Sequence, residues 1–322
     1  MTEPAQPHYL VEDPLFGSFV ETSQPPEVIA EGCVWTEGPV WLDGRLFFND
    51  IPNKRMLCWT EGDGVTVALS NSDFANGNTL DESGHMVSCE HGGRRVVRRL
   101  NPFNFDALQI VASSYQGKRL NSPNDVVVRS DGTIWFTDPP YGINSDIEGY
   151  RAESEIGGCY VFCVGKDGSI KAVATDFDKP NGLAFSPDER QLYIADSGAI
   201  RGASFPGIDY DLPHHIRVFD VEGDTLSNGR VFAVIEPGVP DGFRVDHEGF
   251  VWTSALDGIH CLTPEGERIG KIGLPSQTSN ICFGGEDGKT LFITSSDKVY
   301  RVFSSRRDAA HLMKEKTVGA GG

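Results

Sequence analysis

The stretch KPNGLAFSPDERQLYIAD, residues 179–196, reads as two short strands joined by a tight turn. Apolar runs of strand length, at 183–185 and 191–195, are bracketed by the turn-forming residues Asn181-Gly182 and Pro187-Asp188. This arrangement is typical of a β-hairpin. We therefore expect Asn181 in a turn just before the first strand and Asp196 at the end of the second.

The same pattern recurs along the chain. Copies begin at Thr36 (TEGPVWLDGRLFFND), Phe74 (FANGNTLDESGHMVSCE), Ser122 (SPNDVVVRSDGTIWFTD), Val239 (VPDGFRVDHEGFVWTSA) and Ser279 (SNICFGGEDGKTLFITS). With the first stretch there are six, each with two clear strands and room for two more. Self-similarity at such a period indicates a repeat architecture. The sequence predicts an all-β fold, a six-bladed β-propeller with four antiparallel strands per blade.

The ends of the chain indicate how such a ring closes. Residues 27–30 supply one strand before the first copy, whereas the last copy has only three evident strands, at 281–283, 291–294 and 298–303. We expect the N-terminal strand to join the last blade and remove its open edge. The predicted organisation is a loose arm at 1–26, one propeller domain at 27–305 and a frayed C-terminal tail at 306–322.

Two insertions interrupt the repeat. Residues 138–158 and 197–215 each separate the second and third strands of their copies. Because the strands run up and down, both loops return to the end of the ring where each copy begins. Long loops on a rigid frame are where function usually lies, so we expect them to line a mouth, although they could also be plain surface insertions.

Composition restricts the partners. Net charge is −18, with 46 Asp and Glu against 28 Lys and Arg, which disfavours nucleic acid. The seven cysteines are scattered without a CxxC motif, and the polar N-terminus lacks an apolar signal or membrane segment. We expect a reduced, cytoplasmic protein with no membrane partner.

A ring of polar residues follows from the fold. In a propeller the first strand of each blade lines the channel, so the residues that open the copies converge at one end: Glu37, Asn76, Asn124, Asn181, Asp241 and Asn280. All present oxygen, and two are carboxylates, which suits Ca²⁺ or Mg²⁺ better than Zn²⁺. Without a cation, the two carboxylates would oppose each other's ionisation.

An alternative reading applies to each Asn or Asp of the ring. Asn and Asp before Gly are ordinary turn residues that often bond only to their own backbone. Asn76 and Asn280 are therefore channel lining or turn residues on this evidence. Glu37 is different, because Glu has little role in turns, and Asp241 gains weight as its partner.

Five motifs also resemble a known family. TEGPVW (36–41), NSPNDVVV (121–128), DPPYG (138–142), KPNGLAFSPDE (179–189) and PDGFRVD (240–246) are similar to the family of senescence marker protein (regucalcin), gluconolactonase and luciferin-regenerating enzyme, especially its bacterial gluconolactonase branch. The resemblance covers about residues 30–305. It implies a divalent metal, mostly Ca²⁺ with Mg²⁺, Mn²⁺ or Zn²⁺ as substitutes, held by Glu37, Asn124, Asn181 and Asp241.

The activity implied is hydrolysis of a sugar lactone such as glucono-1,5-lactone to the aldonic acid. One departure matters: regucalcin-like members of the family carry, two residues before the Asn that matches Asn124, an Arg that contacts the sugar, and here that residue is Ser122. Sugar recognition must then differ, and the candidate substrate-binding residues are Asn76, Arg119, Asp138 and Tyr141.

For the chemistry, a base must take a proton from the attacking water. Asp241 is the candidate general base, and a metal-tuned water is the alternative. His91, in CEHGGRR, is expected on the mouth side and is a second catalytic candidate as a proton shuttle or substrate contact, although a lone loop His is often structural.

Two rival functions remain at this stage. One is a phosphotriesterase or broad-specificity lactonase of the same fold, and the other is a non-catalytic calcium-binding propeller. The expected partner of the favoured function is a small-molecule sugar lactone, and no feature of the sequence indicates an oligomeric state.

Overall fold

The computed structural model describes residues 8–101, 104–105, 107–200 and 207–310. Within these residues, six antiparallel sheets of at least four strands follow one another along the chain. The first blade contains β3 (Thr36–Leu42), β4 (Arg45–Asp50), β5 (Arg55–Thr60) and β6 (Gly64–Leu69). The second contains β7 (Ala75–Leu80), β8 (Met86–Glu90), β9 (Arg95–Arg99) and β10 (Leu108–Ala112). The third contains β13 (Val126–Val128), β14 (Ile134–Asp138), β15 (Cys159–Val164) and β16 (Ile170–Phe177).

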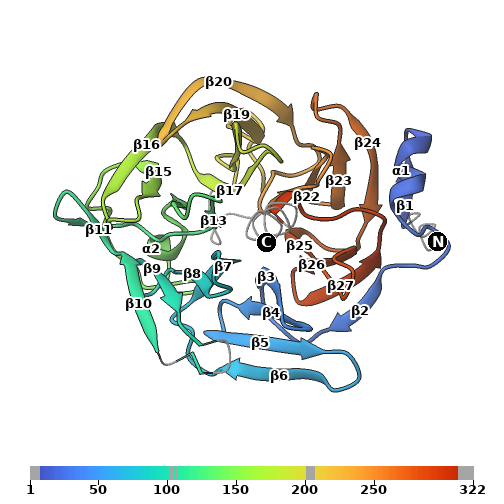
Figure 1. Cartoon of the computed structure of the whole chain (residues 1–322), viewed down its shortest axis with the longest axis horizontal. Helices are drawn as coiled ribbons and strands as arrows, with labels where there is room; N and C mark the ends of the chain where they lie inside the picture. Colours follow the sequence, from blue (N-terminus) through green and yellow to red (C-terminus); the bar gives the residue numbers. More distant parts are fainter. Residues whose placement is uncertain (1–7, 102–103, 106, 201–206, 311–322) are drawn as a thin grey trace, which may run out of the picture.

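The other three blades complete the ring. They contain β17 (Pro180–Phe185), β18 (Gln191–Asp196), β19 (His215–Glu222) and β20 (Thr225–Val234); β21 (Phe243–Val245), β22 (Val251–Ala255), β23 (Gly258–Leu262) and β24 (Arg268–Gly273); and β25 (Thr278–Gly284), β26 (Thr290–Ser295) and β27 (Lys298–Phe303) with β2 (Glu27–Ala30). Figure 1 shows the blades around a central axis, with β3, β7, β13, β17 and β25 innermost. The predicted six-bladed propeller is confirmed.

The predicted closure is confirmed as well. Strand β2 pairs antiparallel with β27, so the first propeller strand in the sequence is the outermost strand of the last blade. Glu27 lies opposite Arg301, and their side chains form an ion pair of 2.7 Å. The ring is thus closed by backbone pairing between its two ends.

The N-terminal arm is not loose over its described residues. Strand β1 (Tyr9–Val11) adds a fifth strand to the fifth blade by pairing with β24. It is followed by α1 (Pro14–Phe19), which Asp13 caps through Leu15 N. Phe16 is fully buried, with its ring centroid 6.0 Å from that of Trp252. A three-residue strand and a six-residue helix carry too little pattern to be read from sequence.

The start of the C-terminal tail is also ordered by contacts. The buried Arg306 binds both carboxylate oxygens of Asp246, at 2.8 and 3.1 Å, and stacks over Phe19. Asp308 bridges to Asp246 through the backbone. The expectation of a frayed tail therefore fails for residues 306–310; residues 311–322 lie outside the described part.

The turn predicted at Asn181-Gly182 is instead part of strand β17. Pro180 pairs with Asp196 and Leu183 with Ile194, so Asn181 and Gly182 form a bulge in the innermost strand. A Cβ on Gly182 would lie 2.3 Å from the carbonyl oxygen of Asp241 in the next blade. The glycine is required because neighbouring strands approach closely at the axis.

The insertions lie where they were expected along the chain. Residues 139–158, which include α2 (Tyr141–Asn144), link β14 to β15, and residues 197–214 link β18 to β19, with 201–206 outside the described part. A hairpin of β11 (Ser114–Tyr115) and β12 (Lys118–Arg119) joins the second and third blades. Among the described residues, no helix is long and apolar enough to cross a membrane.

Candidate functional site

The innermost strands bring the ring residues to one end of the channel. Hydrogen bonds between neighbouring blades fix their spacing: Gly182 N donates to the Asp241 carbonyl at 3.0 Å and Gly242 N to the Ser279 carbonyl at 2.6 Å. The Asn280 side chain donates to Glu37 Oε2 at 3.1 Å, which joins the last blade to the first. All six are well enclosed: Glu37, Asn76, Asn124, Asn181 and Asn280 are at most 5% exposed, and Asp241 is partly exposed.

The two ring acids share one electrostatic environment. Burial raises the pKa of Glu37 to about 8, and the nearby Asp125 adds to the shift while the Gly38 N–H opposes it. Desolvation and then the charge of Glu37 raise the pKa of Asp241 well above its ordinary value. Two acids that oppose each other's ionisation in an enclosed mouth provide favourable sites for a cation.

The donor set fits a hard divalent cation. Among the described residues, no three His, Cys, Asp or Glu side chains are grouped so as to hold a metal. The ring itself offers two carboxylates, Glu37 and Asp241, and the side-chain amides of four Asn residues, including Asn124 and Asn181. Mixed carboxylate and amide oxygens are the ligands that Ca²⁺ takes in proteins.

His91 is placed beside the ring but is fully engaged. Its Nδ1 donates to the Glu148 carbonyl at 2.9 Å, and its Nε2 lies 3.3 Å from the Asn76 side-chain nitrogen, from which it accepts. The imidazole is fully buried, which lowers its pKa to about 4. His91 is thus neutral at pH 7 and holds Asn76 and the first insertion in place, which favours a positioning role over proton transfer.

The first insertion crosses the mouth toward the first two blades. Tyr150 packs edge-on against Phe74, with ring centroids 5.2 Å apart, and Lys54 Nζ lies 4.4 Å from the Phe74 centroid. These contacts bring Glu148 to the ring, where its charge raises the pKa of both Glu37 and Asp241. Burial raises the pKa of Glu148 itself to about 7. Sequence reasoning missed this third acid, and its only signal was its place in an insertion expected at the mouth.

Asp138 has a structural position. Its two carboxylate oxygens accept from the backbone N–H groups of Asn121 and Ser122, both at 2.8 Å, and it is fully buried. Ser122 in turn donates to the Pro139 carbonyl and accepts from Gly142 N, which anchors α2. Both side chains are occupied in holding the base of the first insertion.

Tyr141 is the candidate substrate contact that the structure leaves available. Its buried hydroxyl lies next to Ser197 and within the field of Asp241, and it makes no hydrogen bond of ordinary geometry among the described residues. Burial and then the charge of Asp241 raise its pKa well above the ordinary value. Because buried polar groups are normally hydrogen-bonded, this hydroxyl is a candidate to donate a hydrogen bond to a bound ligand. By contrast, Arg119 lies exposed on β12, where its backbone N–H binds Glu155.

A second layer lies directly beneath the ring. Asp125 follows Asn124, is 2% exposed, and raises the pKa of Glu37 and Asp241. Arg244, on β21, approaches it with 4.0 Å between Nη1 and Asp125 Oδ2. Sequence reasoning missed this pair, although a signal was present: Gly follows the ring residue in four of the six copies, whereas Asp125 follows in the third.

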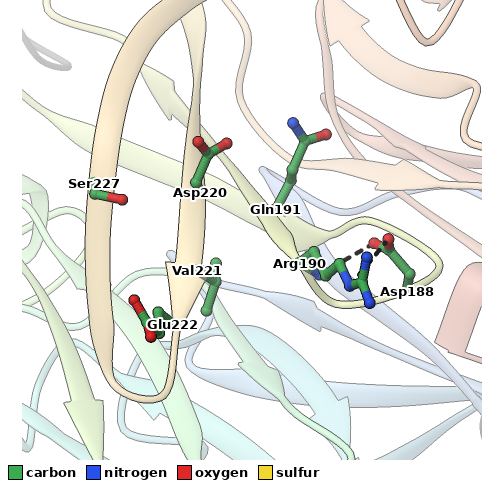
Figure 2. A pocket seen from close by; sticks show the side chains of 7 residues that line it. All are labelled: Asp188, Arg190, Gln191, Asp220, Val221, Glu222 and Ser227. Atoms are coloured by element: carbon green, nitrogen blue, oxygen red, sulfur yellow. Dashed lines mark hydrogen bonds and ion pairs between the residues drawn. The ribbon is translucent and has the colours of Figure 1, made fainter.

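A hollow on the surface lies elsewhere. An open groove of about 550 Å³ lies at the far end of the fourth blade, on the turns between β17 and β18 and between β19 and β20 (Figure 2). Asp188 and Arg190 pair with each other there, and Asp220 and Glu222 from the β19–β20 hairpin line the same groove. Because β17 runs from Asn181 toward this turn, the groove is at the end of the blade remote from the ring.

The propeller region of the chain matches a known family. Residues 35–297 match the family model described as SMP-30/Gluconolactonase/LRE-like region. The chain belongs to this family. All four expected metal ligands fall inside the matched region.

Individual relatives agree with this assignment. A gluconolactonase from Zymomonas mobilis subsp. mobilis is 34% identical over 315 residues, which covers 90% of this chain and 84% of that protein. The solved structure of a gluconolactonase from Xanthomonas campestris superposes with a TM-score of 0.81 at 32% identity, covering 94% of this chain and 98% of that one. A regucalcin from Oryctolagus cuniculus is 27% identical over 83% of this chain and 85% of its own length.

Proposed function

We propose that the protein is a cation-dependent hydrolase that opens a sugar lactone such as glucono-1,5-lactone, with Ca²⁺ held by Glu37, Asn124, Asn181 and Asp241. The observation that carries the proposal is the enclosed set of two carboxylates and two amides beside the unpaired hydroxyl of Tyr141. The similarity to bacterial gluconolactonases supports the reaction class.

The chemistry divides between the cation and the protein. When bound, the cation polarises the lactone carbonyl and favours the negative charge that develops on its oxygen. We assign to Asp241, or to a water tuned by the cation, the acceptance of a proton from the attacking water, which contributes about 10²–10⁴-fold in such reactions. Tyr141 offers a hydrogen bond to the sugar.

The surrounding residues define the shape of the mouth. His91 keeps the Asn76 amide oriented, because its Nε2 accepts from that amide while its Nδ1 holds the Glu148 carbonyl. The first insertion is attached through Tyr150 to Phe74 and brings Glu148 near the ring. Ser122 is buried and donates to the Pro139 carbonyl, so its hydroxyl is not available for the sugar contact expected of an Arg in regucalcin-like members.

The test is proton release from glucono-1,5-lactone by protein treated with a chelator and then supplied with Ca²⁺. We expect activity only after Ca²⁺ is added, and loss of activity in Asp241→Asn protein. Asp188→Asn is the matched control, because it makes the same change on the turn between β17 and β18, at the end of the fourth blade remote from the ring. Equal rates with and without chelator would refute the proposal, and hydrolysis of a phosphotriester but no lactone would favour the rival enzyme.

A further inference from the structure

We propose that Arg244 is a built-in cation beneath the metal ring, and that it sets how tightly the ring holds its divalent ion. Arg244 is a positioning residue here, since it acts through Asp125 and does not reach the reacting atoms. The inference rests on the proposed function, because it takes the ring to be a cation site.

The chain of contacts runs along the channel. The Asn280 side chain donates to Glu37 Oε2 at 3.1 Å and lies next to Asp125, which places Asp125 immediately below the ring. The side chain of Asp125 is 2% exposed, and its Oδ2 has no hydrogen-bond partner among the described residues. The positive charge that faces this oxygen is that of Arg244, whose Nη1 lies 4.0 Å from Asp125 Oδ2.

Arg244 is fixed in the channel from two further directions. Its Nη1 donates to the Phe243 carbonyl at 2.9 Å, and its Nε lies 4.0 Å from Asp308 Oδ2. Asp308 belongs to the C-terminal segment that Asp246 holds at the other end of β21 through the backbone bridge and through Arg306. The carboxylates of the ring and of Asp125 are thus followed by the positive charge of Arg244 and then by the carboxylate of Asp308.

This order determines the sign of each effect. A fixed positive charge below the ring repels a cation bound above it, and it also neutralises Asp125, which would otherwise attract that cation. Removing the charge of Arg244 should therefore tighten cation binding. Removing the charge of Asp308 leaves the positive charge of Arg244 less compensated, so it should weaken cation binding. This effect should be smaller than that of removing Arg244, because Asp308 is 24% exposed and screened by water.

The experiment is calorimetric titration of Ca²⁺ into chelator-stripped full-length protein, which measures affinity without any turnover. We expect Arg244→Gln to lower the Kd at least tenfold and Asp308→Asn to raise it about threefold. The double variant Arg244→Gln with Asp125→Asn should return toward the wild-type Kd. Arg268→Gln is the matched control, because it removes an Arg of the same blade that pairs with Glu12 at the outer edge, and its Kd should stay within twofold of wild type.

The outcomes separate the two proposals. If wild-type protein binds no Ca²⁺, the proposed function fails and this inference with it. If wild type binds Ca²⁺ but Arg244→Gln and Asp308→Asn leave the Kd within twofold, only the inference is overturned. Should Arg244→Gln not fold, the opposite sign expected for the more exposed Asp308→Asn keeps the test decisive.

Discussion

Acidification should loosen the mouth through one buried histidine. His91 has a folded-state pKa of about 4, against about 6.5 for the free imidazole, because it is fully buried. Between these pH values the imidazole of His91 is protonated in the unfolded chain and neutral in the folded protein. The unfolding free energy therefore falls as the pH falls from 6.5 toward 4. This contribution amounts to a loss of roughly 2 kcal/mol of unfolding free energy between pH 7 and pH 5.

The structure also indicates where the strain appears first. A proton on Nε2 would face the Asn76 side-chain nitrogen, 3.3 Å away, so that two donors meet. Asn76 must turn its amide, or the first insertion must move with the Glu148 carbonyl that holds Nδ1. Acid should therefore disturb the mouth before it unfolds the blades.

The assay is urea unfolding at pH 7 and pH 5 in the presence of a chelator, followed by tryptophan fluorescence. Wild type should lose roughly 2 kcal/mol more than His91→Gln over this range, since the carboxylates common to both proteins cancel. His8→Gln, at an exposed position in the arm, should behave as wild type. Equal losses in wild type and His91→Gln would refute the assignment of His91 as a buried neutral base.

Three further changes test other parts of the account. Tyr141→Phe should lower kcat/KM for a sugar lactone about fivefold, the loss of a neutral hydrogen bond worth roughly 1 kcal/mol, without lowering the unfolding free energy; an unchanged kcat/KM would remove Tyr141 from the site. Phe16→Ala should cost about 3–5 kcal/mol in urea unfolding, because it leaves a cavity against Trp252, whereas a loose arm would give almost no change. Gly182→Ala places a methyl group 2.3 Å from the carbonyl oxygen of Asp241, so it should lower the unfolding free energy by about 1–3 kcal/mol and weaken Ca²⁺ binding in titration. If both the unfolding free energy and the Ca²⁺ affinity equal those of wild type, the two strands must move apart freely.

The fold could be predicted because the same two-strand pattern occurs six times in the sequence. Each blade needs turn residues between two short apolar strands, and residues 179–196 show both. The ring could be predicted for the same reason: Glu37 and Asp241 occupy equivalent places in copies of one unit. Their convergence follows from closure of the ring, which the pairing of β2 with β27 confirms.

What sequence reasoning missed depends on contacts outside the repeat. Asn181-Gly182 was interpreted as a turn because the approach of the next blade to Gly182 is tertiary and leaves no local mark. Glu148 reaches the ring through an irregular loop whose path is set by Tyr150 packing on Phe74. Strand β1 is too short to show a period, and it is defined only by the free edge of β24.

The most direct test of the central claim is a crystal structure of the protein grown with Ca²⁺. The account predicts one cation at the end of the channel, with side-chain oxygens of Glu37, Asn124, Asn181 and Asp241 at about 2.3–2.6 Å, the range for Ca²⁺ ligands. A fully occupied cation bound elsewhere, with these four side chains surrounding only water, would contradict it.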